Sequence, residues 1–152
     1  MSKIFVDADA CPVRQEAQKV ATRYKVKIIM VSNGGIRPSN DPMVETIIVS
    51  AGADAADDWI VDNAQKNDIV ITQDILLAAR CLKKQVIALG NSGKEYDANN
   101  IGNAVAMREL NQHLRETGEG GSFNPSFKKN DRSQFLQALD LLVTRALAAN
   151  KE

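Results

Sequence analysis

Five short runs of apolar residues mark the first ninety positions of the chain. They are rich in β-branched side chains and cover residues 4–6, 27–32, 46–50, 69–72 and 86–89. In each run the apolar residues are nearly continuous and do not alternate with polar ones, which is the pattern of strands that helices cover on both faces. We therefore expect a mainly parallel sheet of about five strands.

Amphipathic patterns separate these runs. After Pro12, apolar side chains recur with a helical period and charged residues occupy the other face, which predicts a helix over residues 13–24. Two more helices are expected over residues 54–66 and 75–84. This alternation of strands and helices predicts an α/β fold with three layers, in which the sheet lies between two layers of helices.

After residue 89 we expect no further strand. Residues 101–116 and 133–149 both have helical patterns, and the second has a clear apolar stripe. Between them, residues 118–130 contain glycine, proline and lysine and form a loop longer than a simple connector. Because no repeat or second domain is evident, the prediction is one domain over residues 1–152 with extra C-terminal helices.

Composition narrows the class of protein. The chain has 152 residues, 44% of them hydrophobic and 25% charged, so it is long enough to fold without a disulfide or a metal. Its 19 basic and 19 acidic residues cancel, which disfavours a protein that coats nucleic acid but allows a local phosphate-binding surface. No glycine-rich nucleotide motif is present, so we expect no dinucleotide cofactor. The sequence predicts no oligomeric state.

Two further features concern the compartment. Two aspartates occur within the first nine residues, so no apolar stretch long enough for a signal peptide or a membrane span precedes them. Cys11 and Cys81 are isolated, which is typical of reduced, partly buried thiols. We expect a cytoplasmic protein that does not enter a membrane.

Aspartates stand where three of the predicted strands end. Asp7 and Asp9 follow the first run, Asp74 follows the fourth, and the helix after the third run opens with Asp54, Asp57 and Asp58. The carboxyl ends of parallel strands meet at one edge of a sheet, and ligands bind outside that edge. Three separate segments are therefore expected to bring carboxylates to the same place.

Crowded carboxylates repel one another unless protons or a cation neutralise them. Oxygen ligands without a nearby histidine or cysteine suit Mg²⁺ or Mn²⁺, and such an ion supports phosphodiester hydrolysis. We therefore expect catalytic roles for Asp7, Asp9 and Asp74. The expected metal ligands are these three acids together with Asp54, Asp57 and Asp58.

Each of these acids also has a structural interpretation. Asp54 and Asp74 both stand where the N-cap of a helix belongs. Asp57 or Asp58 would interact favourably with the dipole of the same helix. Asp9 is placed to cap the helix that follows Pro12. The sequence leaves these alternatives open.

The candidate contacts to a substrate are Arg14, Asn33 and Arg37, which would bind a phosphate, and Lys94, which would contact a nucleic-acid strand through its charge. Gly34 and Gly35 would expose backbone N–H groups beside Asn33, although a glycine pair is equally typical of a plain turn.

Weaker candidates lie near the C-terminus. The lysines at positions 128 and 129, with Phe123 and Phe127, have the charge and aromatic character that bind a nucleic-acid strand, but loop aromatics also anchor loops on a core. Arg108 and Arg132 are more typical of ion pairs.

Five stretches of the chain resemble the YaiI/YqxD family of uncharacterised bacterial proteins. They are VDADACPV at 6–13, GADAADDWIV at 52–61, DIVITQDILLAARCL at 68–82, NIGNAVAMREL at 100–110 and the DR…F…ALD run at 131–140. Together they cover almost the whole chain. By resemblance, that family is grouped with PIN-like nuclease domains, which implies a parallel sheet covered on both faces by helices and an acidic site for Mg²⁺ or Mn²⁺.

The PIN-like pattern implies roles for particular acids. Its first-strand aspartate corresponds to Asp7, with Asp9 beside it, and its T-x-D aspartate corresponds to Asp74. The helix acid is Asp54 or Asp57. This chain lacks the second acid that many PIN-like domains have just after T-x-D, and the doubled acid at 57 and 58 is the available substitute. Membership of the family implies no established activity or substrate, but the acids themselves predict metal-dependent hydrolysis of a phosphodiester, with RNA as the expected substrate.

Two other functions stay open. A PIN-like fold can serve as a non-catalytic module that binds nucleic acid or protein and keeps its acids for a structural ion. The D-x-D of Asp7 and Asp9 also resembles haloacid-dehalogenase-type phosphatases, in which one aspartate is the nucleophile and the next a general acid. Cys11 stands where that family has threonine or valine, and only Asp74 stands where it has paired acids, so we prefer the nuclease interpretation.

Overall fold

One mixed sheet of six strands forms the centre of the protein. The computed structural model describes residues 2–9, 11–34, 37–50, 52, 54–103, 105–107, 109–110 and 129–149. The strands are β1 (Ile4–Asp7), β2 (Ile28–Ser32), β3 (Val44–Ile48), β4 (Ile69–Ile71), β5 (Ile87–Leu89) and β6 (Glu95–Tyr96). Their order is β3-β2-β1-β4-β5-β6, and all neighbours are parallel except β5 and β6. The expected, mainly parallel sheet is confirmed.

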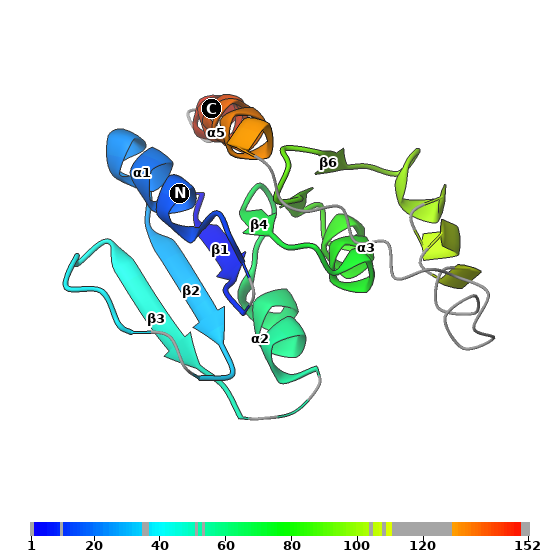
Figure 1. The fold of residues 1–152 in the computed structure, drawn as a ribbon, viewed down its shortest axis with the longest axis horizontal. Helices are drawn as coiled ribbons and strands as arrows, with labels where there is room; N and C mark the ends of the chain where they lie inside the picture. Colours follow the sequence, from blue (N-terminus) through cyan, green and yellow to red (C-terminus); the bar gives the residue numbers. More distant parts are fainter. Residues whose placement is uncertain are drawn as a thin grey trace.

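Helices cover both faces of this sheet. They are α1 (Arg14–Tyr24), α2 (Ala55–Asn63), α3 (Ile75–Lys83) and α5 (Lys129–Ala149), and residues 101–103, 105–107 and 109–110 are also helical. Figure 1 shows α1 and α5 on one side of the strands and α2 and α3 on the other. The α/β fold with three layers is thus confirmed. No helix in the described ranges combines the length and the apolar character needed to cross a membrane.

Each face of the sheet has its own hydrophobic core. Ile4 and Val6 of β1 pack in the core that includes α1 and α5, whereas Phe5 packs in the core that includes α2 and α3. Successive side chains of a strand point to opposite faces, so Asp7 at the end of β1 continues the face of Phe5. This register directs Asp7 toward α2 and α3.

The strand order contains a switch point between β1 and β4. The chain builds β1, β2 and β3 outward in one direction and then places β4 on the opposite side of β1. In open parallel sheets, ligands bind outside the carboxyl ends of the strands at such a point, because the connections on its two sides leave in opposite directions and open a crevice. A ligand site is therefore expected at the carboxyl ends of β1 and β4.

Several expected boundaries were wrong. We expected no strand after residue 89, but β6 pairs with β5 through a tight turn in which Gly93 N donates to the Gly90 carbonyl at 3.1 Å. A strand of two residues is too short to show a period. The third strand begins at Val44 and not at residue 46, because its register is set by pairing with β2.

Helix boundaries also differ from the expected ones. Helix α2 ends at Asn63, three residues before the predicted end, and α5 begins at Lys129, inside the predicted loop. The rest of that loop, with Phe123, Phe127 and Lys128, lies outside the described residues, as do residues 111–116 of the preceding predicted helix and Arg108. Both cysteines are free, as expected, and Cys81 is buried.

Candidate active site

Thr72 joins the ends of the two strands that flank the switch point. Its hydroxyl group donates a hydrogen bond of 2.9 Å to Oδ2 of Asp7 and accepts one of 2.9 Å from the backbone N–H of Asp74. Thr72 is buried, so water does not compete for these contacts. Asp7 and Asp74 are thereby held in a fixed relation across the ends of β1 and β4.

Asp74 has the N-cap role that the sequence allowed. Its Oδ1 accepts hydrogen bonds from the N–H groups of Leu76 at 2.9 Å and Leu77 at 3.2 Å, which is an N-cap of α3. The cap uses one carboxylate oxygen and leaves Oδ2 outside it. Capping orients the side chain and does not remove it from the group of acids.

Asp57 extends from the first turn of α2 toward the same place. Burial raises its pKa from 3.8 to about 7, with further contributions from the charges of Asp74 and Asp7, a hydrogen bond with the Asp74 carboxyl group and the charge of Asp54. These causes place Asp57 within electrostatic range of the two strand-end acids. We call Asp7, Asp57 and Asp74 the acidic cluster.

The pKa of Asp7 is also raised. Burial is the largest cause, the hydrogen bond from Thr72 acts in the opposite direction, and the charges of Asp74 and Asp9 add to the increase. Burial and two neighbouring negative charges thus outweigh the hydrogen bond that stabilises the charged form of Asp7. The acidic cluster therefore favours either protons or a cation.

Asp9 is exposed and is held by the end of β2. Its Oδ1 accepts a hydrogen bond of 2.7 Å from the Ser32 hydroxyl, and its Oδ2 accepts one of 2.9 Å from the backbone N–H of Asn33. Helix α1 has no side-chain cap, so the capping role considered for Asp9 is wrong. The carboxylate instead ties the loop after β1 to the loop after β2.

Asp58 and Asp54, the other expected metal ligands near the start of α2, have different surroundings. Asp58 forms an exposed ion pair of 2.9 Å with Arg80 of α3, so its charge is compensated outside the acidic cluster. Asp54 occupies the N-cap position of α2 but makes no capping hydrogen bond through its side chain. Its charge acts on Asp57. Of the six acids that the sequence predicted as ligands, Asp7, Asp57 and Asp74 form the acidic cluster. Asp9 and Asp54 are its neighbours, and Asp58 is compensated by Arg80.

The chemistry of the acidic cluster suits a hard divalent cation. All of its donors are carboxylate oxygens, and Mg²⁺ is commonly held by one or two carboxylates together with water and substrate phosphate. Among the described residues, however, no three acidic, histidine or cysteine side chains are already placed to hold one ion together. The residues that could hold such an ion are the pair Asp57 and Asp74, with Asp7 next to them.

The comparison with known proteins agrees with the sequence motifs. Residues 5–145 match the family described as "Uncharacterized BCR, YaiI/YqxD family". The chain belongs to the YaiI/YqxD family. A UPF0178 protein of Mesorhizobium japonicum is 57% identical over 95% of this chain and 93% of its own length, and one of Agrobacterium fabrum is 54% identical over 94% of both. A third, from Rhizobium meliloti, is 52% identical over 93% of this chain and 97% of its own.

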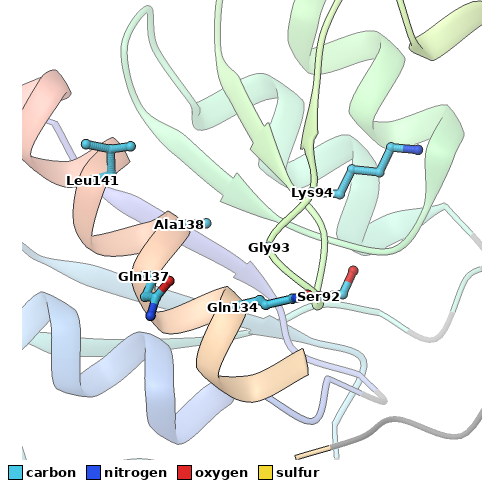
Figure 2. A pocket seen from close by; sticks show the side chains of 7 residues that line it. All are labelled: Ser92, Gly93, Lys94, Gln134, Gln137, Ala138 and Leu141. Atoms are coloured by element: carbon cyan, nitrogen blue, oxygen red, sulfur yellow. The ribbon is translucent and has the colours of Figure 1, made fainter. Parts of the chain in front are cut away.

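All of the candidate contacts to a substrate lie within residues 5–145, the range that matches the YaiI/YqxD family. Arg14 and Arg37 line one pocket between α1 and β3. Lys94 lines a different hollow of about 500 Å³ between the β5–β6 turn and α5, and Figure 2 shows its side chain extending away from α5. Arg14 and Arg37, both expected to contact a phosphate, thus line the same pocket, and Lys94 lies in a different place.

The Asn33-Gly34 segment uses its N–H groups internally. The Asn33 N–H donates to Asp9, and the Gly34 N–H donates to the Ser32 hydroxyl at 3.0 Å. Both groups are therefore engaged within the protein, and the plain-turn interpretation fits Gly34, whose φ is 126°. The side chain of Asn33 is exposed, and Gly35 lies outside the described residues.

Sequence reasoning missed Tyr96 of β6. Its side chain is buried, and burial together with the charge of Asp74 raises the pKa of its hydroxyl group. It was missed because β6 itself was not expected, although an aromatic residue just after a glycine-containing turn is a usable signal. Arg132, expected to form an ion pair, does so with Glu16 at 3.1 Å.

Proposed function

We propose that this protein is a hydrolase that cleaves phosphodiester bonds in RNA with Mg²⁺ or Mn²⁺, and that the acidic cluster binds the ion. The observation that carries the proposal is the convergence of Asp7, Asp57 and Asp74, from three different elements, at the switch point of the sheet. Such a convergence costs electrostatic free energy, which a divalent cation would offset. Asp58, in contrast, forms an ion pair with Arg80 and takes no part in this convergence.

The residues of the acidic cluster have distinct tasks in this proposal. Thr72 keeps Asp7 oriented, and the first turn of α3 keeps Asp74 oriented, so neither has to be ordered when the substrate arrives. Asp57 must lose its proton before it can act as a ligand. Once bound, the ion would neutralise charge on the phosphoryl oxygens and lower the pKa of a water molecule. Asp9 has no catalytic task in this proposal, because both of its oxygens accept hydrogen bonds from the end of β2.

The phosphatase alternative is less well supported by the contacts. It needs Asp7 free to attack phosphorus and Asp9 turned toward the leaving oxygen. Both oxygens of Asp9 accept hydrogen bonds from the end of β2, and Asp7 accepts one from Thr72. The non-catalytic binding module becomes the conclusion if the experiment below detects neither cleavage nor metal binding.

The test uses purified wild-type protein and the variants Asp7→Asn, Asp74→Asn and Asp62→Asn. Asp62 is an exposed residue of α2 outside the acidic cluster, so its variant controls for the loss of one negative charge. Each protein is incubated with single-stranded and with structured RNA, in Mn²⁺ and in EDTA, and Mn²⁺ binding is measured by calorimetry. Asparagine also caps helices, so Asp74→Asn should keep α3 intact.

We expect weak cleavage by the wild type and by Asp62→Asn in Mn²⁺, most of it lost in the two cluster variants and in EDTA. Both cluster variants should stay folded, and each should be as stable as the wild type or slightly more stable without metal, because one source of repulsion is removed. Equal cleavage by all variants, or cleavage in EDTA, would assign the activity to a contaminant or another site. Absence of both cleavage and Mn²⁺ binding in the wild type overturns the proposal.

A further inference from the structure

A small pocket lies on the α1 face of the sheet, beside β2 and β3. Its volume is about 190 Å³, and its polar lining consists of Arg14, Gln15 and Gln18 of α1, Arg37 and Ser39 of the β2–β3 connection, and Thr46 of β3. No acidic residue lines it. Two guanidinium groups, brought together from positions far apart in the sequence, thus face a space that contains no compensating negative charge.

Neither arginine has an anionic partner in the described part of the chain. The ion pairs found there use Arg23, Lys27, Arg80, Arg132 and Arg145. The guanidinium group is planar and donates hydrogen bonds in a fork that matches the oxygens of phosphate. The amide and hydroxyl groups of the lining add neutral donors. This chemistry recognises an anion with several oxygens.

The size of the pocket limits what that anion can be. Sites for whole small molecules usually measure roughly 300–1,000 Å³. At about 190 Å³ this pocket accommodates a phosphate group but not a nucleobase with its sugar. The ligand is therefore a phosphate that belongs to something larger, whose remaining parts lie outside the pocket.

Arg14 connects the pocket with the strand end that carries Asp7, because it is the first residue of α1, and α1 follows β1 after a short connection. Cys11, in the connection from β1 to α1, is within electrostatic range of both Arg14 and Asp7. Helix α1, which carries Arg14, covers one face of the sheet, whereas Asp57 and Asp74 belong to elements on the other. The arginine pocket thus lies beside β2 and β3 on the α1 face, and the acidic cluster lies at the ends of β1 and β4.

We propose that the Arg14–Arg37 pocket binds one phosphate group of a nucleic-acid strand while a nearby phosphodiester of the same strand lies at the acidic cluster. This inference rests on the proposed hydrolase function and deepens it. A chain with no net charge does not attract a polyanion as a whole, and the acidic cluster repels one. A separate cationic pocket supplies the attraction that the reacting site lacks.

The test measures binding without cleavage. A fluorescently labelled single-stranded RNA of about ten nucleotides is titrated in EDTA with wild type, Arg14→Gln, Arg37→Gln, the double variant and Lys19→Gln. Lys19 is exposed on α1 outside the pocket and controls for the loss of one charge. Both arginines are exposed, so folding should be unaffected. We expect each single arginine variant to weaken binding about fivefold to tenfold at low salt and to reduce the salt slope by about 0.7.

Inorganic phosphate and a nucleoside monophosphate are added as competitors to identify the source of the phosphate. Both should displace the RNA from wild type only at millimolar concentration. If the double variant binds RNA as tightly as Lys19→Gln does, the proposal is overturned, even if phosphate alone binds the arginines. If the arginines control RNA binding but no metal-dependent cleavage exists, the hydrolase function fails and the pocket stands. If cleavage depends on Asp7 and Asp74 but not on the arginines, the hydrolase function stands and the pocket proposal fails.

Discussion

Thr72 donates a hydrogen bond of 2.9 Å to Asp7, and this contact crosses the switch point of the sheet. It links two residues that are 65 positions apart in the sequence. The same hydroxyl group accepts the N–H of Asp74, so one side chain sets the position of two of the three acids in the cluster.

Replacing Thr72 by valine should therefore affect stability and chemistry together. The variant leaves a buried N–H group of Asp74 and an oxygen of Asp7 without their partner, which should lower the free energy of unfolding by about 1–3 kcal/mol. Loss of the hydrogen bond also raises the pKa of Asp7 further, since this contact opposes the effect of burial. Urea unfolding at pH 7 measures the change in the free energy of unfolding. Thr72→Ser keeps the hydroxyl group and should recover most of the loss.

The raised pKa of Asp57 predicts how stability depends on pH without metal. Because this pKa is about 7 in the folded protein and 3.8 in its ordinary state, the folded protein holds more protons than the unfolded chain between these values. The contribution of Asp57 to stability is present below about pH 4, is lost as the pH rises to 7, and stays lost above it. Because Asp57 is partly exposed, solvent screening limits its effect on the free energy of unfolding to about 1 kcal/mol.

The measurement compares wild type, Asp57→Asn and Asp62→Asn by denaturant unfolding in EDTA from pH 5 to pH 8. Asp57→Asn should be the more stable protein at pH 8 and lose most of that advantage at pH 5, whereas Asp62→Asn should follow the wild type. A constant difference across the range would mean that Asp57 does not titrate there and that its neighbours are too far away to act on it.

Gly93 is expected to be irreplaceable in the β5–β6 turn. Its φ is 89°, and a Cβ atom added there would lie 2.7 Å from the carbonyl oxygen of Gln134 in α5. Gly93→Ala should therefore lower the free energy of unfolding by about 1–3 kcal/mol. Gly102, in a helical segment with open space around it, is the matched control. Gly102→Ala should raise stability by about 0.5–1 kcal/mol, because alanine favours helix. Thermal unfolding of both variants tests the pair.

Neither thiol should react readily in the folded protein. Burial raises the pKa of Cys81 to about 12 and also raises that of Cys11. Both groups are thiols and not thiolates at pH 7.5, and only the thiolate attacks disulfide reagents. A thiol-reactive chromogenic disulfide should therefore label the native protein slowly and both cysteines quickly in guanidinium. The Cys11 thiol donates a hydrogen bond of 3.9 Å to Oδ1 of Asn91, and one fast equivalent in the native state would contradict this placement.

Local patterns in the sequence determined the fold class and the location of the acids. Continuous apolar runs specify strands that are covered on both faces, and helical periods between them specify the covering layers. Aspartates at the ends of those runs must reach the carboxyl edge of any parallel sheet. This is why Asp7 and Asp74 were identified, and why both a cap and a ligand role could be assigned to Asp74.

Only the tertiary structure decided which acids face one another. Asp57 and Asp58 are adjacent in the sequence, but neighbouring residues of a helix point about 100° apart. The packing of α2 against the sheet turns Asp57 toward Asp74 and leaves Asp58 to pair with Arg80. Similarly, strand order put Asp7 beside Thr72, and the edge position of β3 brought Arg37 to Arg14. Such contacts depend on long-range packing, and no local pattern of residues records it.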